Sequence, residues 1–391
     1  MELRTELFDV PDRIERPRDR LGVRAMTKLT ANFLGVLLLA QVVFAQESRE
    51  KVHVDDVERT YVVRLPKGYN SQQRYPVVLL LHAMNQNADD MERLTQFDDL
   101  ADKNGVIAIY PSALHGRWNI GVRPELNDPM ARRGGGPGST GGGWPGSGYP
   151  GGGNWPGGGY PSGGGGYPGG GRPGGQQGGQ NTPPGPPPPD LDKKLPGADD
   201  LAFFNLMLDD VSSKFSVDTS RIYATGLSEG GLMAFRIGCA LADRLAAIAP
   251  VGAAMPKTMT CLPSRPMPVV MINGKSDPIV PFGGGREHNL DLSTISVEDS
   301  AKMWAKINRC SEKPNRSKVA PRDKGGTEMN VDTYGDCQKS AKVLLYGLKG
   351  TGNTWPSGEQ YASEREVGKT SHDIDANQLI WSFLGEHRLE Q

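Results

Sequence analysis

Short apolar runs alternate with amphipathic segments along the chain from Val57 onward. The runs Val77 to Leu81 and Val106 to Tyr110 are typical of strands that are buried on both faces. Residues 199–215 are predicted to form an amphipathic helix, because apolar side chains recur at helical spacing at Leu201, Phe204, Leu208, Val211 and Phe215. This alternation predicts an α/β fold, with a mostly parallel sheet and helices on both of its faces.

The same pattern predicts the remaining elements. Val62 to Leu65 is expected to be an early strand that ends at Pro66. Further strands and helices follow from the later apolar runs. The strands are expected at 221–225, 246–251, 268–272 and 342–348, and the helices at 232–241 and 374–384.

Residues 131–190 break this pattern. The chain contains 52 Gly and 31 Pro, and most of the excess lies here, around five aromatic-proline pairs that begin at Trp144, Tyr149, Trp155, Tyr160 and Tyr167. Such a composition buries too little apolar surface to offset its ordering entropy, so we predict a disordered insert within a single domain. Two roles stay open: a neutral insertion in a surface loop, or a tether whose rings contact a polymer or a cell wall.

The N-terminal region carries an export pattern that begins at Met26. A short positive region leads into the apolar run Phe33 to Phe44, and Ala45 precedes the expected cleavage site. We therefore predict a signal peptide at 26–45, a non-native upstream extension at 1–25, and a secreted or periplasmic domain at 46–391. The apolar run is too short for a stable membrane span, and a signal anchor is the alternative.

Charge and cysteine content narrow the function further. The formal net charge of -1 gives no basic field for nucleic acid or an anionic membrane surface. Outside the cytosol, an even number of cysteines favours disulfides over a metal site. Sequence order suggests the pairs Cys239–Cys261 and Cys310–Cys337, although three connectivities are open. No cysteine has a partner at zinc-ligand spacing, and we expect neither a metal nor an organic cofactor.

The motif with the clearest chemistry is Gly226-Leu227-Ser228-Glu229-Gly230, which lies between a predicted strand and a predicted helix. In that context G-x-S-x-G forms a nucleophile elbow, because its glycines permit the sharp turn that exposes the serine hydroxyl. Ser228 is thus the predicted nucleophile. The backbone N–H of Glu229 is expected to stabilise the oxyanion that develops during attack on a carbonyl.

Two loops after buried strands are predicted to complete the site. The loop that follows Leu81 is expected to give the second oxyanion donor, from the N–H of Met84 or Ala83, with His82 as a structural brace. Asp277 follows a later buried strand and a tight glycine turn. Its position after the elbow predicts that it orients the catalytic base.

With these motifs the chain resembles the secreted poly(3-hydroxybutyrate) depolymerase and feruloyl esterase group of α/β hydrolases. The resemblance runs from about 55 to 385 outside the insert, and its matching stretches are 59–63, 65–69, 76–82, 110–112, 117–119, 199–203, the elbow, the Asp277 loop and 354–356. It implies an α/β-hydrolase fold and hydrolysis of carboxylic esters, either polymeric or small, with Ser228 as nucleophile and Asp277 as triad acid.

One position departs from the group's pattern Gly-His-x-Trp-Pro, in which the histidine is the base. Here the sequence reads Gly352-Asn353-Thr354-Trp355-Pro356, and an amide cannot take a proton from serine at neutral pH. His372, just before the last predicted helix, keeps the order Ser–Asp–His and is the replacement candidate, or else an exposed residue beside a helix cap.

Two functions therefore stay open. The first is a secreted serine esterase that acts through an acyl-enzyme on polyester or esterified polysaccharide. The second is a catalytically impaired homologue that acts as an extracellular binding protein, with Asn353 in place of the base. Trp118 is predicted either to line the substrate cleft or to fill the core beneath the 115–121 loop.

Overall fold

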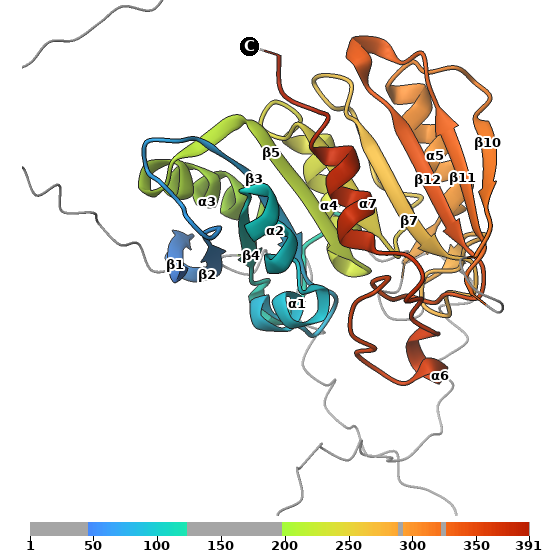
Figure 1. Ribbon diagram of the computed structural model, residues 1–391, viewed down its shortest axis with the longest axis horizontal. Coiled ribbons are helices and arrows are strands. Elements are labelled where there is room, and N and C mark those ends of the chain that lie inside the picture. Colours follow the sequence, from blue (N-terminus) through green and yellow to red (C-terminus); the bar gives the residue numbers. More distant parts are fainter. Residues whose placement is uncertain (1–45, 123–197, 288–291, 322–325, 391) are drawn as a thin grey trace, which may run out of the picture. The chain divides into compact units, whose positions relative to one another are not determined.

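A ten-stranded sheet with helices on both faces organises the protein (Figure 1). The computed structural model describes residues 46–122, 198–287, 292–321 and 326–390. These residues belong to one unit, Phe44–Gln391. The predicted upstream extension, the signal peptide and the 131–190 insert lie outside the described residues.

The middle of the sheet is parallel. Its strand order is β1-β2-β4-β3-β5-β6-β7-β12-β11-β10, with parallel pairing from β4 to β12 and antiparallel pairing at both edges. The strands are β1 (Glu47–Val54), β2 (Val57–Arg64), β3 (Tyr75–Leu81), β4 (Ile107–Pro111), β5 (Val217–Leu227), β6 (Ala247–Val251), β7 (Val269–Gly274), β10 (Asn315–Val319), β11 (Met329–Tyr334) and β12 (Val343–Leu348).

Each face of the sheet has its own apolar cluster. On one face, α1 (Ala88–Thr95), α2 (Asp98–Asn104) and α7 (Ala376–Leu384) cover the strands. The other face is covered by α3 (Asp200–Lys214), α4 (Glu229–Ala240) and α5 (Val297–Ile307). Smaller elements are β8 (Gly285–Arg286), β9 (Ser293–Thr294), η1 (Leu114–Gly116), η3 (Gln338–Ser340) and α6 (Glu364–Val367). This arrangement confirms the predicted fold class.

The connectivity indicates where a ligand site is expected. The chain leaves β3 toward β4 on one side and later returns to β5 on the other side of β3. In open α/β sheets, the carboxyl ends of the strands at such a switch point flank the ligand site. The loop after β3 and the elbow after β5 are therefore neighbours at this edge.

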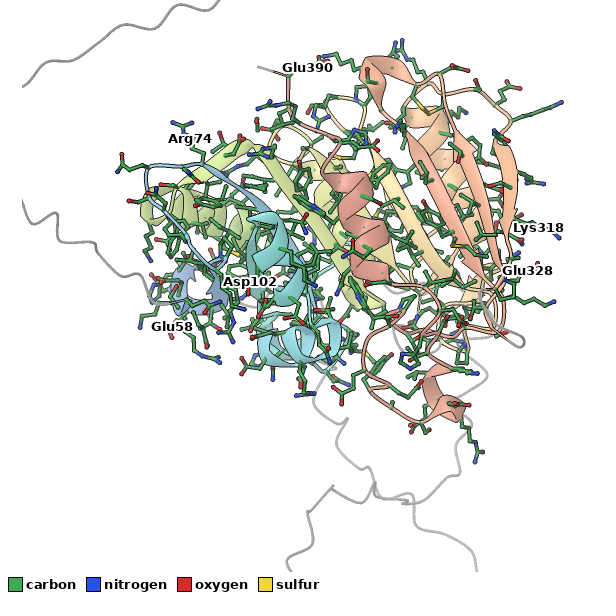
Figure 2. The ribbon with its side chains drawn as sticks, in the orientation of Figure 1. Glu58, Arg74, Asp102, Lys318, Glu328 and Glu390 are labelled. Atoms are coloured by element: carbon green, nitrogen blue, oxygen red, sulfur yellow. A yellow bond between two sulfur atoms is a disulfide. The ribbon has the colours of Figure 1, made fainter. Side chains whose placement is uncertain are left out.

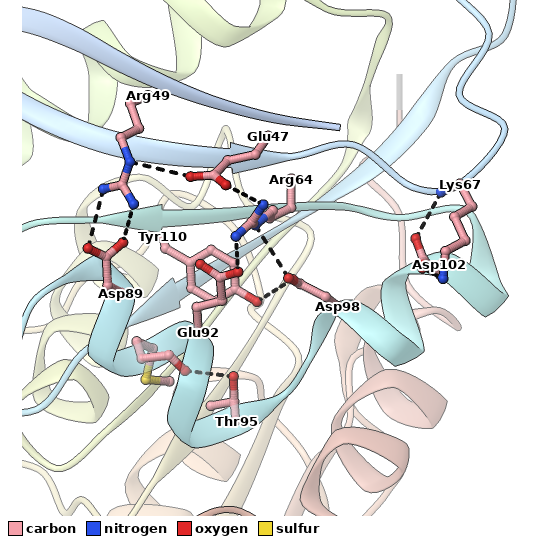
Figure 3. A network of polar contacts seen from close by, with 11 residues as sticks. Glu47, Arg49, Arg64, Lys67, Asp89, Glu92, Thr95, Asp98, Asp102 and Tyr110 are labelled. Atoms are coloured by element: carbon pink, nitrogen blue, oxygen red, sulfur yellow. Dashed lines mark hydrogen bonds and ion pairs between the residues drawn. The ribbon is translucent and has the colours of Figure 1, made fainter. Parts of the chain in front are cut away.

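Charged contacts attach the outer hairpin β1–β2 to α1 and α2 (Figure 3). Arg64 lies at the centre of this network, where it contacts Glu47 at 2.6 Å, Glu92, and Asp98 at 3.5 Å. Arg49 pairs with Asp89 at 2.7 Å. Since β1 is largely polar, these contacts replace the apolar burial that holds the inner strands in place.

Two disulfides lie on the α4–α5 face, and they confirm the pairs that sequence order suggests. Cys239 in the last turn of α4 is bonded to Cys261, and Cys310 after α5 is bonded to Cys337. Each bridge closes a short loop, with separations of 22 and 27 residues. In the described ranges, no helix has the length and apolar character needed to cross a membrane.

Candidate active site

Ser228 lies at the sharp turn between β5 and α4, with backbone angles φ 56° and ψ -116°. A non-glycine residue rarely adopts such a conformation, and strain of this kind gathers at functional sites. The Ser228 N–H donates to Val251 O at 2.9 Å, which fixes the turn to the neighbouring strand. The residue is 7 % exposed, so little of its surface is open to solvent.

The glycines of the elbow are required by close packing. A Cβ at Gly230 would lie 2.1 Å from Leu81 O, and one at Gly226 would lie 2.6 Å from the Gly230 carbonyl carbon. Both distances are shorter than any van der Waals contact allows. The two glycines thus let the helix start directly against the end of β3, as the motif predicts.

The loop after β3 holds the candidate oxyanion donor. The Ala83 N–H donates to Gln86 Oε1 at 3.1 Å, and the Asn85 N–H donates to Gly116 O at 2.8 Å. In the described ranges, Met84 is the residue between them whose N–H has no assigned acceptor. Of the two predicted donors, Met84 is therefore the one that is available, together with Glu229 at the first turn of α4.

His82 braces this loop from beneath. Its Nε2 accepts the Ala113 N–H at 2.9 Å, so its Nδ1 carries the proton and donates to Ala83 O at 2.7 Å. Burial lowers the pKa of His82 to about 4, and the ring is neutral at physiological pH. These contacts confirm the predicted structural role.

Trp118 packs beside His82. Its indole N–H donates to His82 O at 2.9 Å, and its ring lies 5.6 Å from that of Phe204. The side chain is only 4 % exposed. Its position therefore fits the core ring of the two predicted alternatives, because the packed rings leave little of its surface to face a substrate.

A contact that the sequence does not indicate joins the elbow to the 113–118 loop. Arg117 Nε donates to Glu229 Oε1 at 3.0 Å. Glu229 is 1 % exposed, and desolvation raises the pKa of its carboxyl above the ordinary value, while Arg117 opposes the shift. The backbone oxygen of Gly116, next to Arg117, accepts the Asn85 N–H. The Arg117–Glu229 pair therefore links α4 to the loop after β3 that carries Met84, which is called the oxyanion loop below.

Asp277 follows β7 and is held by three donors. Its Oδ1 accepts the N–H groups of Ile279 and Val280, each at 2.8 Å. Its Oδ2 accepts from Asn353 Nδ2 at 2.7 Å. Burial nonetheless raises the pKa of the carboxyl to about 6, because desolvation outweighs these hydrogen bonds.

Asn353 contacts Asp277 in the way that the group's histidine is expected to. Its side-chain amide donates to Asp277 and also to Gly252 O at 3.0 Å, and the residue is fully buried. The Tyr361 hydroxyl donates to the Asn353 backbone oxygen at 3.0 Å and lies 3.5 Å from its Oδ1. Gly252 and Tyr361 were missed in the sequence, since no motif marks either residue.

His372 has an exposed side chain in the segment before α7. Within the described ranges, no hydrogen bond or ion pair joins its ring to Ser228 or Asp277. Its backbone oxygen lies 3.4 Å from Ser357 Oγ. The structure thus brings Asp277 to Asn353 and leaves His372 at the surface, so a catalytic role of His372 stays a prediction that requires this segment to move.

The arrangement as a whole holds a strained serine, two N–H groups at a helix start and a loop, and a buried carboxylate on an amide. Such a site can stabilise the oxyanion of acyl transfer. What it lacks at position 353 is a group that takes a proton near neutral pH. Across the described ranges, no cluster of three or more His, Cys, Asp or Glu side chains could hold a metal ion.

Comparison with known proteins gives relatives that are named esterases. The chain is 32 % identical over 169 residues to feruloyl esterase B of Piromyces equi, and 28 % identical over 209 residues to a putative esterase of Nocardia uniformis. These matches cover 41 % and 51 % of this chain, but 30 % and 60 % of the relatives. The chain therefore spans less than two thirds of either relative.

Feruloyl esterase D of Neurospora crassa matches over a longer range. It is 22 % identical over 335 residues, which is 85 % of this chain and 83 % of the relative. No family model matches the chain. These relatives confirm the resemblance to feruloyl esterases, whereas the resemblance to poly(3-hydroxybutyrate) depolymerases stays a prediction.

Solved structures with a similar course of the chain also carry esterase names. An acetyl xylan esterase from Aspergillus awamori aligns with a TM-score of 0.45 and 13 % identity, over 86 % of this chain and 99 % of that one. A ferulic acid esterase from Anaeromyces mucronatus aligns with a TM-score of 0.39 and 14 % identity, over 81 % and 87 %. The fold assignment itself rests on the strand order and on the elbow.

Proposed function

We propose that the protein is a serine-type carboxylic-ester hydrolase that acts outside the cytosol on esterified polysaccharide. The observation that carries the proposal is the strained turn at Ser228, with φ 56° at the start of α4 and next to the oxyanion loop. A serine in this conformation costs stability, and it is expected where the hydroxyl has a chemical task. The names of the feruloyl and acetylxylan esterase relatives support the substrate class.

The proposed reaction begins with attack of Ser228 Oγ on the ester carbonyl carbon. The Oγ–C bond forms, and the carbonyl oxygen becomes an oxyanion that the N–H groups of Glu229 and Met84 stabilise. Collapse of this intermediate expels the alcohol and leaves an acyl-enzyme, which water then hydrolyses. Because Asn353 cannot accept the serine proton, that proton passes to water, and we expect slow turnover.

Export is part of the proposal. Two disulfides persist in oxidising compartments and are rare in reducing ones. The signal pattern at 26–45 points to the same location, although that segment lies outside the described residues.

A fluorophosphonate probe tests the nucleophile. We expect covalent labelling of the folded protein at Ser228, located by peptide mass mapping, and none of Ser228→Ala. The labelling should be slower than in an esterase with a complete triad, since the proton acceptor is missing. A folded protein that stays unlabelled after prolonged exposure would contradict the proposal.

The second function, an extracellular binding protein, stays an alternative that one observation motivates. Asn353 Nδ2 donates to Asp277 Oδ2, and its amide cannot take a proton near neutral pH. If that function is the correct one, Ser228 should remain unlabelled while the folded protein still binds a feruloylated oligosaccharide. Binding is measured by calorimetry with the ester intact, so the two functions give different results.

A further inference from the structure

A cavity lies beyond the parallel part of the sheet, on the face that α5 covers. Its volume is about 320 Å³, within the range of small-ligand sites. Strands β10, β11 and β12 form its floor, and α5 and the segment after β7 contribute its side wall. Neither the elbow nor the oxyanion loop contributes a residue to it, so it is distinct from the site at Ser228.

Three cations line this cavity. Arg316 and Lys318 come from the edge strand β10, and Lys275 comes from the segment after β7. Two carboxylates, Glu298 and Asp332, also face it. A third acid, Glu328, lies beside Lys318 outside the lining, so an anion preference rests on Lys275 and on the terminal nitrogens of Arg316.

The cations are only partly neutralised by the protein. Arg316 uses Nε for Asp332 Oδ2 at 3.2 Å, which leaves its two terminal nitrogens for another acceptor. Lys318 lies 3.9 Å from Glu328, and both are at the outer edge of the sheet (Figure 2). Lys318 is 76 % exposed, so this pair is weak. In the described ranges, Lys275 has no assigned carboxylate partner.

The position of Lys275 depends on a glycine. A Cβ at Gly347 in β12 would lie 2.8 Å from Lys275 Cε and 3.4 Å from Phe282 Cζ. Lys275 Nζ lies 5.4 Å from the centre of the Phe282 ring, a cation–π distance. Because Gly347 has no side chain, Lys275 and the Phe282 ring can both pack against β12 at this position.

The cavity is within reach of a polymer bound at the elbow. Lys275 and Asp277 belong to the same segment after β7. In the sheet, β12 is three strands from β5, which is about 15 Å at the usual strand spacing, and β10 is two strands farther. A ligand that fills both sites must therefore be an extended chain.

We propose that this cavity binds a carboxylate-bearing sugar unit of the polysaccharide whose ester bond meets Ser228. The carboxylate is recognised by Lys275 and Arg316. Asn330 is a neutral group that can hydrogen-bond sugar hydroxyls, and the Phe282 ring offers apolar surface. This inference rests on the proposed function and deepens it, since it names an acidic polysaccharide as the substrate class.

Binding is tested without hydrolysis, on the full chain that carries Ser228→Ala. The probe is an unesterified oligogalacturonate of about six units, titrated by calorimetry at low ionic strength. We expect saturable binding that weakens as salt is added, and about tenfold weaker binding after Lys275→Ala or Arg316→Ala. Gly347→Ala should weaken it as well, because its Cβ displaces Lys275. Both cations are exposed, so their removal should leave the fold intact.

Two controls make the result specific. Lys103→Ala removes an exposed lysine from α2 on the other face of the sheet and should leave binding unchanged. A neutral xylo-oligosaccharide of equal length should bind at least tenfold more weakly. Equal binding of both sugars, binding unaffected by the Lys275 and Arg316 variants, or no binding of the acidic sugar up to about 10 mM would overturn the proposal.

Failure here is distinguishable from failure of the proposed function. The Ser228→Ala background removes the reaction, so calorimetry does not depend on catalysis. Conversely, fluorophosphonate labelling of the unaltered protein at Ser228 requires no polysaccharide, so either proposal can fail while the other holds.

Discussion

An asparagine and a histidine at position 353 share one property: each can donate an N–H to Asp277. The Asn353 amide does so at 2.7 Å, and it also binds Gly252 O. Asn353 therefore makes the contact that a histidine would make to Asp277, but it has no second ring nitrogen to accept a proton.

We therefore expect Asn353→His to increase kcat/KM for a small aryl ester by about 100-fold or more, the usual contribution of a positioned general base. Steady-state kinetics measure the gain, and the variant Asn353→His with Ser228→Ala should show none. If the single variant folds and gains nothing, then the oxyanion donors or the access to Ser228 are also impaired.

His372→Ala separates the two candidate bases. Because the imidazole is exposed and has no assigned contact to Asp277 in the described ranges, we expect esterase activity within about twofold of the unaltered protein. Activity with the same ester is the measurement, and Ser228→Ala sets the background. A loss of tenfold or more would show that the segment before α7 moves to deliver His372.

The buried carboxyl of Asp277 predicts a pH dependence of stability. Its pKa is raised from 3.8 to about 6, so the folded protein binds the proton more tightly than the unfolded chain does. The associated stability is complete below about pH 4 and is lost as the pH rises through 6. We compare the free energy of unfolding of Asp277→Asn with that of the unaltered protein at each pH. The difference, variant minus unaltered, should rise by about 2 kcal/mol from pH 4 to pH 7.

Urea unfolding followed by tryptophan fluorescence measures this difference at each pH. The introduced amide also changes the contact with Asn353. The resulting change in the free energy of unfolding is the same at every pH, so it cancels when the values at pH 4 and pH 7 are subtracted. A difference that stays flat from pH 4 to pH 7 would show that Asp277 is ionised throughout.

At the scale of elements, the parallel strands and α3 were predictable because apolar side chains dominate them. The edge strands were not. β10 reads Asn-Arg-Ser-Lys-Val with every residue exposed, and β1 alternates charged residues with partly buried ones. Such strands form because a neighbouring strand offers backbone groups, and no periodicity of their own reveals that. Charged side chains on an edge also limit pairing with other chains.

The candidate site was likewise predictable only in part. The elbow and Asp277 follow buried strands at fixed offsets, so a motif can locate them. No sequence motif indicates which residues from distant segments will be in contact. Arg59 and Asp200 form a buried ion pair at 2.6 Å although they are 141 positions apart on either side of the insert. Asp200 also accepts the Asn119 N–H and thereby fixes the loop beside Trp118.

The junction of β3, β5 and α4 allows a test of the elbow. Gly230→Ala should destabilise the protein by about 3 kcal/mol or more, since its Cβ would lie 2.1 Å from Leu81 O and the backbone there cannot retreat. The matched control is Gly283→Ala, whose Cβ meets nothing within 4 Å. Urea unfolding compares the two; similar stabilities would mean that the elbow is loosely packed.

For the whole molecule, the two disulfides hold the α4–α5 face together. Cys239–Cys261 joins the end of α4 to the segment after β6, and Cys310–Cys337 joins the end of α5 to the turn after β11. Each closes a short loop, with sequence separations of 22 and 27. In the loop-entropy description, a bridge of this length contributes about 3 kcal/mol.

Replacing one bridge by Cys310→Ser with Cys337→Ser should therefore lower the free energy of unfolding by about 3 kcal/mol, and a reductant should lower that of the unaltered protein by up to about twice as much. Unfolding curves with and without dithiothreitol measure both effects, and a thiol-reactive dye confirms that the bridges have opened. The same variant should label at Ser228 like the unaltered protein, because neither cysteine touches the elbow. If opened bridges leave the unfolding curve unchanged, the bonds are not structural, and the argument that they mark an exported protein loses its physical basis.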